Sequence, residues 1–71
     1  MSDEAIKLYI EDLYNIKFDI AKKCFRLANK LATCQDDKSR KLLKDCLNNL
    51  DTEMQDIMNR IEVIKGHLEE R

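Results

Sequence analysis

Residues 43–68 read LKDCLNNLDTEMQDIMNRIEVIKGHL, and this stretch decides the fold. Apolar residues recur in it at alternating spacings of four and three, and the residues between them are mostly polar. Together these apolar positions form the C-terminal ladder: Leu43, Leu47, Leu50, Met54, Ile57, Ile61, Ile64 and Leu68. Such spacing averages about one apolar residue per 3.5, the repeat of a helix that buries one narrow stripe against another helix.

The first half of the chain predicts a second helix, from about residue 3 to about residue 32, with a wider apolar face. Ser2 or Asp3 can cap its start, where an acidic residue also suits the helix dipole. Its apolar arc spans about half of the circumference, which is more than one neighbouring helix covers. The residues that we expect in its core are Ile6, Leu13, Ile16, Ile20, Leu27 and Leu31.

The apolar pattern is interrupted at residues 33–37, TCQDD, where we place a turn. Thr33, Asp36 and Asp37 are all candidate N-caps for a second helix over about residues 37–68. Neither Gly nor Pro marks the turn, so one continuous helix is the alternative. The hairpin is favoured because the wide face of the first helix needs more than one neighbour. Gly66 is a candidate C-terminal cap.

These features predict an all-α fold with a single domain over residues 1–71, an antiparallel two-helix hairpin. The chain has 71 residues, 38% of them charged, no Pro and one Gly. Ordering this many residues costs on the order of 100 kcal/mol, which the core of an isolated two-helix hairpin rarely offsets. We therefore expect the hairpin to self-associate into a four-helix bundle, or to pack against an unidentified protein partner.

Charge is unevenly distributed along the chain. Residues 22–44 carry a net charge of +6 and the remainder −7, for a total of −1. In a hairpin the half next to the turn is then basic and the open half acidic. The basic residues of this half are Lys22, Lys23, Arg26, Lys30, Lys38, Arg40, Lys41 and Lys44. Three interpretations compete: an antiparallel homodimer that pairs opposite charges, a patch that binds phosphate of nucleic acid or lipid, and an ordinary solvated surface.

The sequence contains no motif or spacing typical of assembled catalytic groups, and we expect no enzymatic activity and no cofactor. The single histidine, His67, lies near a predicted helix end, and no Gly-rich phosphate loop or Glu-x-x-His motif occurs. Cys24 and Cys46 are expected at similar heights on opposite helices, which makes them a candidate redox or metal pair. The simpler interpretation is two reduced cysteines at the helix–helix contact.

Nothing in the sequence directs the chain to a membrane or out of the cell. The first residues are acidic where a signal peptide is basic, and no apolar run approaches the roughly 18 residues of a membrane span. Three cysteines, an odd number, fit a reducing compartment better than a disulfide framework. We therefore expect a cytoplasmic protein with no membrane span.

Two groups of proteins resemble this chain. The pattern Ile6-Lys7-x-x-Ile10-x-x-Leu13-x-x-Ile16, followed by Thr33-x-Gln35-Asp36-x-x-x-x-Lys41 and an acidic amphipathic helix, is similar to short helical-hairpin proteins of spore-forming bacteria. This chain has extra residues between the two parts, and the resemblance implies no particular function. The general plan also resembles the Rop-like hairpins, small RNA-binding proteins that dimerise antiparallel into a four-helix bundle. That likeness is of plan, and it transfers no binding residue.

Overall fold

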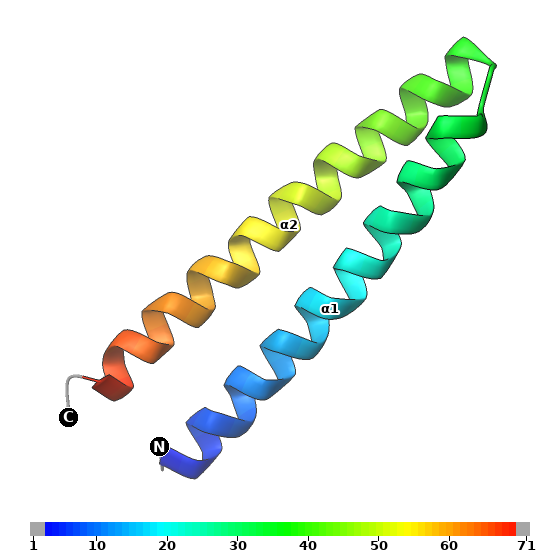
Figure 1. The fold of residues 1–71 in the computed structure, drawn as a ribbon. Coiled ribbons are helices and arrows are strands. Elements are labelled where there is room, and N and C mark those ends of the chain that lie inside the picture. Colours follow the sequence, from blue (N-terminus) through cyan, green and yellow to red (C-terminus); the bar gives the residue numbers. More distant parts are fainter. Residues whose placement is uncertain (1–2, 70–71) are drawn as a thin grey trace.

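The computed structural model describes residues 3–69, which form two α-helices joined by a short turn (Figure 1). Helix α1 spans Asp3–Thr33 and helix α2 spans Asp37–Glu69. The helices lie side by side and antiparallel, so the beginning of α1 and the end of α2 are at the same end of a rod measuring 53 × 14 × 14 Å. This confirms the prediction of an all-α helical hairpin, and the alternative of one continuous helix is wrong.

The core is a single line of side chains between the helices, which we call the seam. From α2 it contains the whole C-terminal ladder, and every member is buried or half-buried. From α1 it contains residues that follow the same spacing of four and three: Ile6, Ile10, Leu13, Lys17, Ile20, Cys24, Leu27 and Leu31. Leu13, Ile20 and Ile61 are at most 5% exposed, and the other seam residues are half-buried.

One expected core residue lies outside the seam. Ile16 is 45% exposed, whereas the neighbouring Lys17 is half-buried. The reason is the phase of the helix. A spacing of four and then three from Leu13 passes through Lys17 and reaches Ile20, so Ile16 falls to one side of the seam. Our expectation that Ile16 belongs to the core of the hairpin therefore needs correction.

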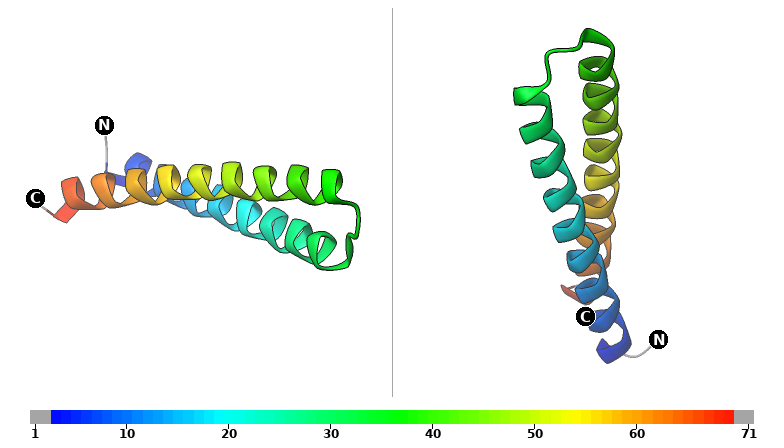
Figure 2. Two further views of the ribbon diagram at one scale, coloured as in Figure 1. Left: turned by 90° about the horizontal axis from the view of Figure 1, so that it is seen from above. Right: turned by 90° about the vertical axis from the view of Figure 1, so that its right-hand side faces the viewer.

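The two views of Figure 2 show that the helices cross obliquely instead of lying strictly parallel. Oblique crossing is what side chains at spacings of three and four produce when the ridges of one helix pack into the grooves of the other. The seam residues of the two helices therefore contact each other along the length of the hairpin. The side of each helix that faces away from the seam is not covered by any other described residues.

Residues 34–36 make the turn, and the structure selects one of the three candidate caps. The carboxylate oxygen Oδ2 of Asp36 accepts hydrogen bonds from the backbone N–H of Ser39 at 3.0 Å and from its hydroxyl at 2.8 Å. This is the N-cap arrangement, and it satisfies a donor that the first turn of α2 leaves unpaired. None of the described residues has a positive φ. Gly66 lies inside α2, so it is not a C-terminal cap.

Candidate protein-interaction surface

The large apolar side chains that remain exposed lie mainly on α1. In the part of the chain that the structure describes, α2 contributes Leu42, Met58 and Val63. The α1 residues are Leu8, Tyr9, Tyr14, Ile16, Phe18 and Phe25. Exposed apolar side chains are common singly on proteins, but a cluster on one element indicates a contact surface. Helix α1 is therefore the element with apolar surface left over after the hairpin has formed.

Two shallow hollows follow one edge of the contact between the helices. One is lined by Tyr9 of α1 together with Asn59, Arg60, Val63 and Ile64 of α2. The other is lined by Ile16, Ile20, Glu53, Asp56, Ile57 and Arg60. Both are open, and charged side chains border them, which is unlike the enclosed apolar pocket that a small-molecule ligand occupies.

A third hollow lies on α1 alone, lined by Phe18, Ala21, Lys22, Phe25 and Arg26. The rings of Phe18 and Phe25 are 62% and 69% exposed. The ammonium nitrogen of Lys22 lies 4.6 Å from the centroid of the Phe18 ring, a cation–π distance. The two phenylalanines are about two helical turns apart. The alanine between them leaves a notch that suits a side chain of another helix.

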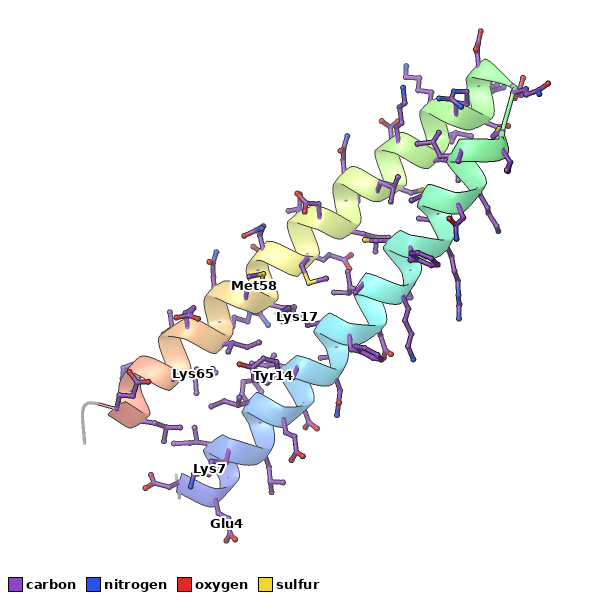
Figure 3. All side chains as sticks on the ribbon, in the orientation of Figure 1. Glu4, Lys7, Tyr14, Lys17, Met58 and Lys65 are labelled. Carbon is purple, nitrogen blue, oxygen red and sulfur yellow. The ribbon has the colours of Figure 1, made fainter. Side chains whose placement is uncertain are left out.

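One turn before Phe18 and on the same side of α1, Tyr14 joins the two helices (Figure 3). The ammonium nitrogen of Lys65, from α2, lies 5.3 Å from the centroid of its ring, and that of Lys17 lies 5.9 Å from it. The pKa of Lys65 is raised, first by hydrogen bonding to the Tyr14 side chain and then by the charge interaction with it. This cross-helix contact between Tyr14 and Lys65 was not expected from the sequence.

The structure brings the predicted basic residues to the end of the hairpin that carries the turn. All are exposed except Arg40, which is half-buried. The guanidinium nitrogen Nη1 of Arg40 donates hydrogen bonds to the backbone oxygens of Leu31 and Cys34, each at 2.9 Å. Arg40 thus satisfies carbonyl groups at the C-terminal end of α1. It is occupied in holding the turn, a role that no sequence pattern indicates.

Cys24 and Cys46, expected at similar heights on opposite helices, do not face each other as a redox or metal pair. All three are free thiols: Cys24 is half-buried in the seam, Cys34 is half-buried beside the turn, and Cys46 is exposed. Cys46 directly precedes the seam residue Leu47, which turns it away from the seam. Within residues 3–69, no group of three or more His, Cys, Asp or Glu side chains is arranged to hold a metal ion.

Comparison with known proteins assigns no function to the hairpin. The chain matches no protein-family model, no curated protein and no solved structure. Neither described helix is both long and apolar enough to cross a membrane. A function for this chain must therefore be inferred from the surface of the hairpin itself.

Proposed function

We propose that the protein is a non-enzymatic interaction module that self-associates as an antiparallel homodimer, a four-helix bundle made of two hairpins. The observation that carries this proposal is the imbalance of α1: Leu13 and Ile20 are buried, while six large apolar side chains of the same helix are exposed. Burying apolar surface contributes about 25 cal/mol per Å². A second helical hairpin is a partner that covers exposed apolar side chains of a helix without new structure.

The size of the hairpin supports the same proposal. In the described part of the chain only three side chains are buried, all of them on the seam. Domains of this size usually need an additional source of stability, such as a disulfide, a metal or a partner subunit. No disulfide joins the three cysteines in the described residues. We also place the protein in a reducing compartment such as the cytoplasm, because an odd number of cysteines suits free thiols better than a disulfide framework.

Charge selects the antiparallel orientation. The basic residues lie at the turn end and most acidic residues at the open end, so parallel hairpins would place like charges together. Each exposed ion pair contributes only about 0–1 kcal/mol. Many such terms of one sign still decide between two orientations that bury similar apolar areas.

Mass measurement in solution tests the proposal. Light scattering across a concentration series should give twice the mass of a single chain at micromolar concentration, and the dimer should persist in high salt because apolar burial provides most of its stability. A monomer that stays folded throughout the series would overturn the proposal.

A second candidate function is nucleic-acid binding, favoured by the cluster of exposed lysines at the turn end. Binding to phosphate of this kind weakens steeply as salt is raised. A gel-shift measurement with RNA and with DNA at low salt tests it. The variant Lys38→Ala with Lys41→Ala should weaken any retardation, and failure of the native protein to retard either nucleic acid would remove this candidate.

A further inference from the structure

Helix α1 carries a second ladder, separate from the seam. It consists of the exposed residues Tyr14, Phe18, Ala21, Phe25, Ala28 and Ala32, which again follow alternating spacings of four and three. We call it the outer ladder. The same alternation places the seam residues on one stripe of α1 and the outer ladder on an adjacent one. A helix with two such stripes is built to pack against two helices.

Helix α2 has no corresponding second stripe. Its exposed large apolar residues, Leu42, Met58 and Val63, are separated by 16 and 5 positions and do not share one spacing. The outer side of α2 is otherwise polar, as expected for a helix that faces solvent. A second hairpin would therefore approach from the side of α1.

We propose that a second copy of this chain packs its own α1 antiparallel against the outer ladder, with the numbers of facing residues adding to 46. This register faces Phe18 with Ala28 of the partner subunit, and Ala21 with Phe25 of the partner subunit. It also faces Tyr14 with Ala32 of the partner subunit. The twofold axis passes beside residue 23, so each contact occurs twice.

Side-chain size supports this register. Every aromatic ring of the outer ladder meets an alanine, so rings fill the notches that the alanines leave. A parallel, in-register pair would instead place each phenylalanine against itself and each alanine against itself, which combines overpacking with voids. Both faults destabilise an interface, because packed apolar surfaces tolerate neither excess volume nor cavities.

Charge along α1 supports the same orientation. Residues 3–19 carry a net charge of −3 and residues 20–33 a net charge of +4. Antiparallel packing lays the acidic half of one α1 along the basic half of the other. Arg26, which lines the hollow around Phe18 and Phe25, comes within one residue of the level of Asp19 of the partner subunit, a difference in height of about 1.5 Å. Charge complementarity of this kind mainly fixes register and orientation.

This inference rests on the proposed self-association, but it can fail separately. The proposed function requires only a dimer. The inference requires that the dimer use the outer ladder in one register. The experiments therefore test the register by cross-linking and the packing by substitution. Cross-linking needs a protein without its native cysteines, which carries Cys24→Ala, Cys34→Ser and Cys46→Ser. Light scattering must first show that this protein forms the same dimer as the native one.

Cross-linking tests the register. Asn15 and Asn29 are exposed, and both flank the outer ladder on the same side. In the proposed dimer, residue 15 of one copy lies within about 3 Å in height of residue 29 of the other, at a rise of 1.5 Å per residue. Residues 15 of the two copies, or residues 29, are separated by roughly 18–24 Å. An equal mixture of the Asn15→Cys and Asn29→Cys proteins under mild oxidant should form the mixed disulfide dimer, and each protein alone should not.

A size swap tests the packing. Ala21→Phe places two rings opposite each other and Phe25→Ala places two alanines opposite each other, so each single change should raise the dimer dissociation constant at least about ten-fold. The two changes together restore one ring facing one alanine, and the constant should return to within about three-fold of the native value. Leu42→Ala, which removes an exposed apolar side chain from α2, is the control and should change nothing. Circular dichroism checks that each variant keeps its helices.

The results distinguish self-association from the use of the outer ladder as the interface. A dimer that gives no mixed disulfide, or whose dissociation constant ignores the single changes, would overturn the outer ladder as the interface while self-association stands. A folded monomer would overturn both. A mixed disulfide together with rescue by the double change supports the proposed interface.

Discussion

Arg40 ties the beginning of α2 to the end of α1. Its guanidinium nitrogen Nη1 donates to the backbone oxygens of Leu31 and Cys34, and both bonds are partly buried. Arg40→Ala removes both bonds and should lower the free energy of unfolding by about 1–3 kcal/mol, the range for hydrogen bonds from charged donors. Urea denaturation measures this. Lys41→Ala, an exposed change one residue away, should stay within about 0.5 kcal/mol of the native protein. Equal effects of the two changes would contradict the role of Arg40.

Asp36 gives the turn a dependence on pH. Hydrogen bonds from the hydroxyl and backbone N–H of Ser39 lower the pKa of its carboxyl, since they favour the charged form. A lowered folded-state pKa stabilises the protein above the pKa of the unfolded state, and this stabilisation is lost as pH falls through the folded-state pKa. Asp36→Ala should therefore lower the melting temperature at pH 7 and make little difference well below about pH 4. A constant difference between the two proteins from pH 7 to pH 2.5 would show that the carboxylate charge is not involved.

At the scale of the helices, the apolar patterns of α1 and α2 differ in how well they predict which side chains face the other helix. In residues 43–68 polar residues separate the rungs, so one stripe stands out, and the structure uses all of it in the seam. In α1 the apolar residues cover half of the circumference and contain two stripes with the same spacing. The sequence alone does not say where in this wide apolar arc the contact with α2 falls, and this is why the expected core includes Ile16, which lies beside the seam and in neither stripe. The contacts of Arg40 with backbone oxygens escape prediction because they depend on the conformation of the turn.

Lys17 interrupts the α1 side of the seam between Leu13 and Ile20. Its stem is half-buried, and its ammonium group lies near the Tyr14 ring instead of in the seam. Lys17→Leu should extend the apolar contact and raise the free energy of unfolding by about 1 kcal/mol. Thermal or urea unfolding measures this. The same change at the exposed Lys23 is the control and should have less than half of that effect. If Lys17→Leu is neutral or destabilising, Lys17 supplies an interaction in the seam that the leucine cannot replace.

For the whole molecule, the proposed dimer fixes where the two turns lie. Packing α1 against α1 with facing numbers that add to 46 places the turns at opposite ends of the assembly. A spin label on Gln35→Cys, in the protein with its native cysteines replaced, should then lie roughly 35–40 Å from the label on the other subunit, because about 24 residues of helix separate their heights at 1.5 Å per residue. Pulsed electron resonance measures distances in this range. A parallel bundle would bring the labels together at one end, and an antiparallel bundle in a different register would shift the distance by about 10 Å for each heptad of displacement. This single distance therefore reports on orientation and register together, and it does so without altering any residue of the outer ladder.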